Sequence, residues 1–140
     1  MTGTADLIAL VSRISGARVL CVGDVMLDRF ISGEVERISP EAPVPVLRIS
    51  DEKAMLGGAG NVARNIVALG GQVTLAAVVG EDAAGQQIEA ELRGLGRATP
   101  RLVIDPSRPT AIKTRFLAGT QQMLRDRKST RLNSSHSQIS

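Results

Sequence analysis

The sequence predicts an α/β fold in which a central, mostly parallel sheet is flanked by helices and carries a small β flap. Two near-continuous apolar runs, VLCVG and VTLAAVV, have the composition of strands that a parallel sheet buries on both faces. Helical segments of about ten residues separate such runs, and this alternation is typical of α/β proteins with crossover connections. Proline and glycine clusters mark the turns between the elements.

The first two predicted elements are a helix and a buried strand. Apolar residues recur at helical spacing over residues 5–14, and Gly16 stands where a helix end favours a left-handed residue. The strand over residues 18–23 follows, and two acids, Asp24 and Asp28, lie beyond its end.

The flap is predicted from two short β segments, residues 30–33 and 44–49, on either side of RISPEAPVP. Pro40, Pro43 and Pro45 exclude a central strand there, because proline cannot donate a hydrogen bond to a ladder. These segments therefore indicate an edge ribbon.

The remaining elements follow in regular order. We expect a helix over residues 60–69 and then a strand in VTLAAVV. A helix capped by Asp82 should follow, with Ile88, Leu92 and Leu95 on its inner face. Strands are expected in RLVID, PTAIKTRFLAG and QQMLR.

Composition excludes several classes of partner. Among 140 residues there are two Phe and no Trp or Tyr, so the aromatic platform of a single-strand nucleic-acid binder is absent. No targeting segment or membrane span is visible. The single Cys21 lies in an apolar run and is expected to be a small buried residue. A cytoplasmic location follows as the expectation.

The end of the chain differs in character from the rest. The run DRKSTRLNSSH matches the translation of a common short-read sequencing adapter from Asp126 to His136. We therefore expect residues 1–125 to be the truncated N-terminal portion of a domain and residues 126–140 to be an artefactual, disordered tail. The tail contains the only histidine. It also has three basic residues and one acid, and so supplies two of the three net positive charges, which argues against nucleic-acid or membrane partners.

The glycine-rich stretch GGAGNVARNI allows three interpretations. Gly58, Gly60 and Ala63 fit a dinucleotide fingerprint, but that motif requires a buried strand just before it, and SDEKAML is polar. The glycines could instead serve only close helix packing. In the third interpretation they form a sugar cradle, in which backbone N–H groups approach a ligand closely and Asn61 offers both a donor and an acceptor.

A family resemblance favours the sugar cradle. The run from Gly57 to Gly80 is similar to the N-terminal signature of the ribokinase-like carbohydrate kinases, and VGDVMLD resembles their opening strand. Asp28 occupies the place of the acid that grips sugar hydroxyls in that family. GDVMLDRF, RISPEAPVPVL, GGAGNVARNI and QQMLR resemble, more closely, the heptose 7-phosphate kinase domains of ADP-heptose synthesis, which feed lipopolysaccharide assembly.

The resemblance implies a reaction and its residues. It implies transfer of a phosphoryl group from ATP, with Mg²⁺, to the anomeric hydroxyl of D-glycero-D-manno-heptose 7-phosphate. Asp28 and Asn61 would orient the sugar together with Gly57 and Gly58. It also implies a homodimer formed through the flap strands of the parent enzyme.

The phosphate that the substrate already carries needs a cationic receiver. Arg37 in the flap and Lys113 and Arg115 in TAIKTRF are the candidates, because guanidinium and ammonium groups bind phosphate. Strand alternation puts Lys113 and Arg115 on one face. The alternative is that they form the solvated polar face of a half-exposed strand.

One family feature is absent from the sequence. The Gly-Ala-Gly-Asp loop, which carries the general base of ribokinase-like kinases, does not occur. We therefore expect no catalytic residue, nucleotide site or metal ligand in this chain, poor ATP binding, and no sugar phosphorylation by the chain alone. The open alternatives are another ribokinase-like sugar or nucleoside kinase, a non-enzymatic binding fragment, and a nucleotide-dependent oxidoreductase domain.

Overall fold

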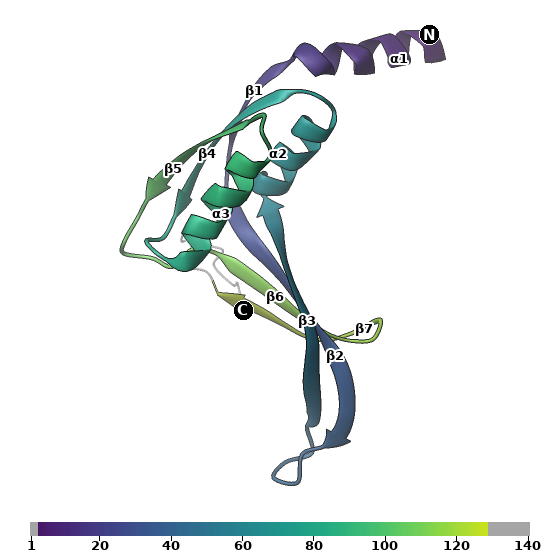
Figure 1. Ribbon diagram of the computed structural model, residues 1–140, viewed down its shortest axis with the longest axis vertical. Coiled ribbons are helices and arrows are strands. Elements are labelled where there is room, and N and C mark those ends of the chain that lie inside the picture. Colours follow the sequence, from purple (N-terminus) through teal and green to yellow (C-terminus); the bar gives the residue numbers. More distant parts are fainter. Residues whose placement is uncertain (1–2, 129–140) are drawn as a thin grey trace, which may run out of the picture.

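The computed structural model describes residues 3–128, which form two sheets and three α-helices (Figure 1). A three-stranded parallel sheet has the order β1-β4-β5, and a four-stranded sheet, here called the lid sheet, has the order β3-β2-β6-β7. The predicted α/β class with a separate β flap is confirmed. The elements are α1 (Thr4–Arg13), a 3₁₀ turn (Ile14–Gly16), β1 (Arg18–Val22), β2 (Val25–Ile38), β3 (Pro45–Gly58), α2 (Ala59–Ala68), β4 (Gln72–Val79), α3 (Ala83–Gly94), β5 (Ala98–Ile104), β6 (Ile112–Ala118) and β7 (Gln121–Lys128).

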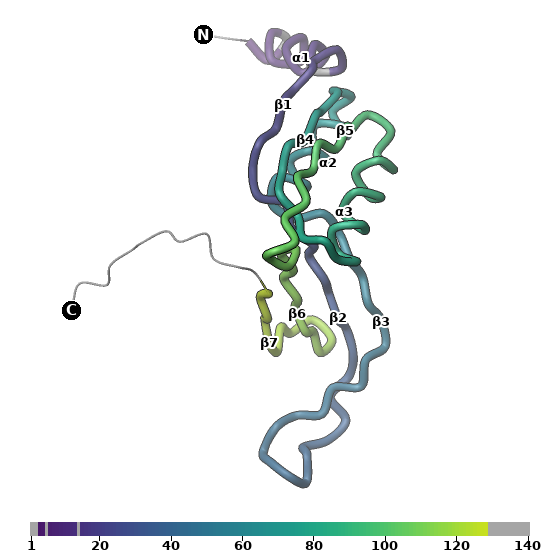
Figure 2. Tube along the Cα trace, turned by 90° about the vertical axis from the view of Figure 1, so that its left-hand side faces the viewer, coloured from purple at the N-terminus to yellow at the C-terminus, as the bar shows by residue number. Residues whose placement is uncertain are grey.

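The core lies between the parallel sheet and two helices. Helices α2 and α3 cover the same face of the sheet, as the side view shows (Figure 2). Every second residue of β4 is buried against them, from Val73 to Val79. Ile88 and Leu92 of α3 are fully buried, as predicted, and burying a side chain of this size contributes about 1.5–3 kcal/mol.

The opposite face of the parallel sheet is uncovered within the described residues. Leu20 and Val22 of β1 are 68% and 74% exposed, and Val103 of β5 is 63% exposed. The prediction that β1 is buried on both faces is therefore wrong for this chain. No described element packs on that side, although the sequence of β1 has the apolar composition of a strand with two covered faces.

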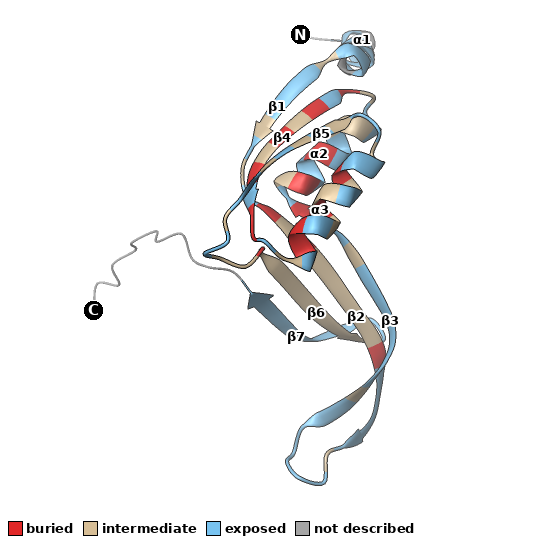
Figure 3. Ribbon diagram, turned by 60° about the vertical axis from the view of Figure 1, so that its left-hand side comes forward, coloured by how far each residue is buried: buried red, intermediate tan, exposed pale blue. Residues whose placement is uncertain are grey.

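The flap is larger than the sequence suggested. Its two strands, β2 and β3, each span 14 residues and pair as one antiparallel hairpin. The predicted segments, residues 30–33 and 44–49, are only parts of these strands. Pro45 opens β3 at the edge of the lid sheet, where a missing N–H is tolerated. The hairpin tip stands away from the rest of the protein and its residues are mostly exposed (Figure 3).

A hydrogen-bonded junction fixes the start of β6 to the parallel sheet. Thr110, which is 1% exposed, accepts a hydrogen bond from the Gly80 N–H at its hydroxyl (2.9 Å). The Thr110 N–H donates to Asp82 Oδ2 (2.9 Å), while Asp82 Oδ1 accepts from the Gly85 N–H (2.9 Å) and caps α3. Burial disfavours the charged carboxylate, but these hydrogen bonds outweigh it and lower the pKa of Asp82.

The end of the described chain departs from the predicted boundary at residue 125. Strand β7 continues through Asp126, Arg127 and Lys128, which pair with β6. The rest of the predicted tail, including His136, lies outside the described residues. No helix among residues 3–128 is long and apolar enough to cross a bilayer.

Candidate functional site

The candidate site lies on the face of the lid sheet that turns away from the core. Along β2, Val25 and Leu27 are 2% and 0% exposed because they pack into the core cluster. Side chains alternate across a strand, so Met26, Asp28 and Phe30 point to the other face. Burial of the odd-numbered residues thereby fixes the direction of the Asp28 carboxylate.

Strand register brings two cations to this carboxylate. β6 runs parallel to β2, and its Lys113 and Arg115 pair with Asp28 and Phe30. Lys113 Nζ lies 2.7 Å from Asp28 Oδ1, and Arg115 Nη1 lies 3.7 Å from the same oxygen. The side chains of Asp28, Lys113 and Arg115 are 15%, 15% and 23% exposed, so this group, here called the Asp28 site, is largely shielded from water.

Met26 and Phe30 position the cations of the Asp28 site. The Arg115 guanidinium stacks over the Phe30 ring, 4.9 Å from its centroid, and a cation–π contact of this kind restricts where the guanidinium can point. Lys113 Nζ lies 3.8 Å from Met26 Sδ. Sequence analysis missed both residues, but their spacing of two from Asp28 is the signal that could have identified them.

Gly57 has no side chain and so leaves room for the Asp28 carboxylate. A Cβ at Gly57 would lie 2.6 Å from Asp28 Oδ2 and 2.9 Å from Met26 Cγ, so glycine is needed at this position. Gly58 and Gly60 are explained by backbone conformation and by helix packing, respectively. Gly58 has a φ of 58°, and a Cβ on Gly60 would lie 3.0 Å from Leu56 Cβ where α2 packs on the sheet. The packing interpretation therefore fits Gly60, the positive φ explains Gly58, and Gly57 belongs to the candidate site.

The dinucleotide interpretation fails for a different reason from the one expected. SDEKAML is not a polar loop, because β3 continues through it to Gly58 by pairing with β2. The glycines therefore do leave a strand. That strand, however, is an antiparallel edge strand, and the strand after α2 belongs to the other sheet. The parallel βαβ unit that holds a dinucleotide is thus not formed here.

Asn61 and Asp24 lie outside the contacts of the Asp28 site. Asn61 is exposed in the first turn of α2, and no hydrogen bond or ion pair among the described residues joins it to Asp28. Asp24 is exposed after β1, and its carbonyl accepts from the Ala59 N–H (2.9 Å) at the start of α2. Asp24 therefore has a backbone role in the turn.

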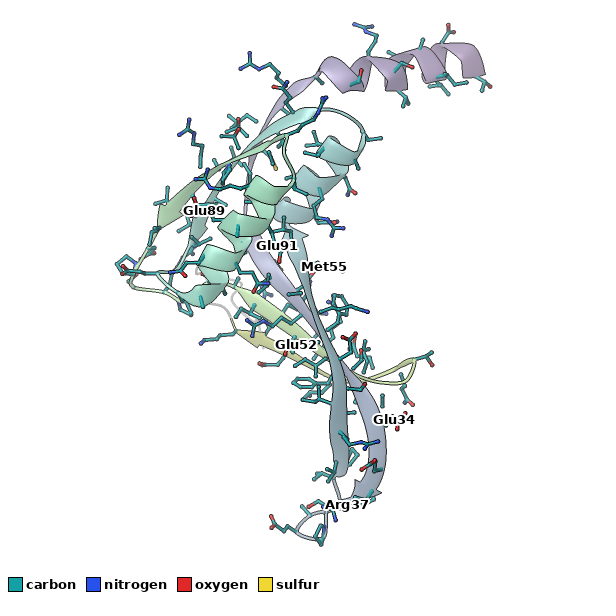
Figure 4. The ribbon with its side chains drawn as sticks, viewed as in Figure 1. Glu34, Arg37, Glu52, Met55, Glu89 and Glu91 are labelled. Atoms are coloured by element: carbon teal, nitrogen blue, oxygen red, sulfur yellow. The ribbon has the colours of Figure 1, made fainter. Side chains whose placement is uncertain are left out.

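Arg37 is not brought to the Asp28 site within this chain. It lies near the tip of the hairpin, far along β2 from the start of α2 (Figure 4). At about 3.3 Å per residue, the nine positions between Asp28 and Arg37 correspond to roughly 30 Å. The sequence placed Arg37 correctly in the flap, but it did not reveal how long the flap strands are.

The Asp28 site has unused hydrogen-bonding capacity. Asp28 Oδ1 and Arg115 Nη1 are buried atoms that take part in ion pairs, with Lys113 Nζ 2.7 Å from Oδ1, but they make no hydrogen bond in the part of the chain described. Buried polar atoms of this kind are normally satisfied, so they are suited to meet a polar ligand. A carboxylate accepts hydrogen bonds from hydroxyls and two adjacent cations bind an anion, which together fit a ligand that carries both groups.

Metal binding has no such support. Within residues 3–128, no group of three or more His, Cys, Asp and Glu side chains is arranged to hold a metal ion.

Comparison with protein families assigns the chain. The profile of the pfkB family carbohydrate kinases matches residues 17–137. The chain belongs to the pfkB family. The resemblance to ribokinase-like kinases that the sequence indicated is thereby confirmed.

Individual relatives narrow the comparison. The pfkB chain is 57% identical over 125 residues to the bifunctional protein HldE of Rhodospirillum rubrum, covering 89% of this chain and 25% of that protein. It is 58% identical over 113 residues to the D-beta-D-heptose 7-phosphate kinase of Bordetella bronchiseptica, covering 81% of this chain and 36% of that protein. The chain therefore spans only a quarter to about a third of the length of these relatives.

Solved structures agree on the fold. A carbohydrate kinase from Agrobacterium tumefaciens superposes with a TM-score of 0.66 at 24% identity, over 80% of this chain and 35% of that one. The pfkB chain thus has the architecture of part of such a kinase, with α2, α3 and the parallel sheet on one side and the lid sheet on the other.

Proposed function

We propose that this chain supplies the sugar-binding part of an ATP-dependent kinase that phosphorylates D-glycero-D-manno-heptose 7-phosphate at its anomeric hydroxyl. The observation that carries the proposal is the Asp28 site, where one carboxylate and two cations meet on the lid sheet. The name of the Bordetella bronchiseptica relative, a D-beta-D-heptose 7-phosphate kinase that is 58% identical over 113 residues, favours the heptose phosphate over other sugars.

Each residue of the site has a role that its chemistry suits. Asp28 accepts hydrogen bonds from sugar hydroxyls, and Gly57 leaves the space that its carboxylate occupies. Lys113 and Arg115 bind the phosphate that the substrate already carries. Asn61 approaches the sugar from the first turn of α2, and the backbone of Gly58 approaches it from the N-cap of that helix. Arg37 is left out of this phosphate subsite because of its distance from Asp28.

In this proposal, ATP and Mg²⁺ bind to parts of the kinase outside residues 3–128, and the general base also lies there. The described residues have no metal-ligand cluster, and the sequence has no Gly-Ala-Gly-Asp loop. We therefore predict that the purified 140-residue chain, given ATP, Mg²⁺ and heptose 7-phosphate, releases no ADP above background in a coupled assay. Release of ADP that depends on the heptose phosphate would contradict this prediction.

Titration calorimetry on the chain tests the proposed sugar site. Heptose 7-phosphate should bind to the unmodified chain, and Asp28→Asn should weaken that binding by about tenfold or more, because the charge-assisted hydrogen bonds to hydroxyls are lost. Asp51→Asn is the matched control, since Asp51 is an exposed acid on the neighbouring strand that pairs with Lys53. Tighter binding of adenosine or ribose than of the heptose phosphate would favour a different kinase of the family. A folded chain that binds none of these ligands would favour a non-enzymatic fragment.

We also propose that the kinase acts in the cytoplasm and pairs through its hairpin tips. The tip carries exposed apolar side chains, among them Ile38 and Val44, which are 60% and 52% exposed. Ile38→Lys should shift the sedimentation coefficient toward that of a monomer, while Leu7→Lys in α1 should not. An unchanged sedimentation profile for Ile38→Lys would rule out this interface.

A further inference from the structure

We propose that the Lys113–Asp28 ion pair makes the site selective for phosphorylated sugars, because the phosphate of the ligand must draw Lys113 away before Asp28 Oδ1 can accept a sugar hydroxyl. This inference rests on the proposed function and adds to it a mechanism of discrimination. It concerns the order in which the charges of the Asp28 site exchange partners.

One oxygen of the carboxylate, Oδ1, faces both cations in the ligand-free site. Lys113 Nζ lies 2.7 Å and Arg115 Nη1 3.7 Å from Oδ1, while Oδ2 occupies the space that a side chain at Gly57 would fill. A sugar hydroxyl that approaches Oδ1 therefore competes with an ammonium group for the same oxygen. An uncharged sugar can win this competition only by leaving a largely buried cation without its partner, which is costly.

The charges of the site do not balance without an anion. Asp28 contributes one negative charge, whereas Lys113 and Arg115 contribute two positive charges. Three further basic residues, Lys53, Arg125 and Arg127, share this face by strand register, although they are exposed. Of these, Lys53 is paired with Asp51. A phosphate brings a charge of about −1.5 to −2, which matches the two shielded cations and releases the carboxylate.

The first test uses the unmodified chain and two probes, inorganic phosphate and the unphosphorylated heptose. Phosphate at a fixed concentration should raise the affinity for the heptose by about fivefold or more, because it occupies Lys113 and frees Asp28. Sodium chloride at equal ionic strength is the control and should not have this effect. If phosphate leaves the heptose affinity unchanged or lowers it, the exchange does not occur and the inference is wrong.

The second test uses Lys113→Met, which keeps an unbranched side chain of similar length and leaves Arg115 beside Asp28. The affinity for heptose 7-phosphate should fall by about tenfold, whereas the affinity for the unphosphorylated heptose should rise by roughly threefold or more. Arg29→Met is the matched control, because Arg29 neighbours Asp28 in sequence but pairs with Glu52 on the other face of the strand. Thermal unfolding of both variants shows whether the fold is retained.

The outcomes separate the inference from the function on which it rests. If Lys113→Met lowers the affinity for both sugars, or leaves that of the unphosphorylated sugar unchanged, Lys113 is only a phosphate contact. The sugar kinase proposal then stands and the inference falls. If the folded, unmodified chain does not bind heptose 7-phosphate at all, the proposed function fails and the inference fails with it.

Discussion

At the scale of single residues, Gly57 and Asp28 depend on each other. The carboxylate of Asp28 fits beside β3 only because Gly57 has no side chain, and the two residues lie far apart in the sequence. The atom that a Cβ would meet is the end of a side chain, so a substitution would displace the carboxylate rather than the strands.

Gly57→Ala is therefore expected to weaken heptose 7-phosphate binding by about tenfold while changing the free energy of unfolding little, since the strained contact is with a movable carboxylate. Gly94→Ala is the control, because a Cβ at Gly94 meets nothing within 4 Å, and it should leave binding intact. Calorimetry and denaturant unfolding measure the two effects. Equal binding by Gly57→Ala and the unmodified chain would show that the position of Asp28 does not matter.

Asp82 gives a second prediction at the residue scale, through pH. Its pKa is lowered from the ordinary value of 3.8 in the folded state, so its stabilisation is complete above that value and is lost as pH falls through the folded pKa. Asp82→Asn removes the charge and one of two acceptor oxygens, and should lower the free energy of unfolding by about 1–3 kcal/mol at pH 7. Below pH 4 the difference from the unmodified chain should shrink. A difference that does not change with pH would mean that the charge of Asp82 contributes nothing.

At the scale of elements, α3 is the helix that most clearly holds the core together. Its inner face, Ile88 and Leu92, is fully buried in the core cluster, whereas Leu7, Ile8, Leu10 and Val11 of α1 are 50% to 64% exposed. A leucine in α3 is therefore expected to contribute more to the free energy of unfolding than a leucine in α1.

Leu92→Ala should lower the free energy of unfolding by about 2–5 kcal/mol, because it leaves a cavity in the packed layer. Leu7→Ala in α1 makes the same chemical change at a side chain that is 53% exposed and should cost little. Urea unfolding followed by circular dichroism compares the two variants. Similar costs for both would mean that α1 is buried in solution.

At the scale of the whole molecule, the main feature is the apolar face of the parallel sheet that no described element covers. Leu20, Val22 and Val103 are exposed on the same face of this sheet, on the two strands that form its edges among the described residues. Exposed apolar faces and open edges promote association.

We predict that the chain self-associates as its concentration rises and binds a hydrophobic dye, and that Val22→Lys with Val103→Lys reduces both effects. Val62→Lys, at a 47% exposed position on α2, is the control and should not reduce them. Light scattering after size exclusion and dye fluorescence provide the measurements. A monodisperse monomer without dye binding would show that this face does not drive association.

Local sequence patterns predicted the elements well and their extents less well. The inner face of α3 and the Asp82 cap follow from spacing alone, and both are present. SDEKAML was missed as a strand because its polar residues lie on a lid sheet that is exposed on much of its surface, where apolar alternation is weak.

The candidate site was predicted in part for a related reason. The likeness of Asp28 and the glycine stretch to a family motif drew attention to them, and strand alternation grouped Lys113 with Arg115. Their meeting with Asp28 depends on the pairing of β2 with β6, a contact between residues far apart in the chain that no local pattern encodes. The same long-range information was needed to exclude Arg37, whereas Met26 and Phe30 could have been identified from their spacing of two from Asp28.

The hairpin acts mechanically as a cantilever. β2 is clamped in the core at Val25 and Leu27, supports Asp28 close to the clamp, and extends to a free end at Ile38. Its ladder is interrupted between Ser32 and Gly33 and again near Arg37, and bending concentrates where a ladder is broken. A tilt of about 10° beyond Gly33 moves the free end by roughly 3 Å, given a rise of about 3.3 Å per residue. Bending therefore occurs at these interruptions and not at Val25 and Leu27. A molecule that pushes on the hairpin tip consequently leaves the Asp28 carboxylate in place.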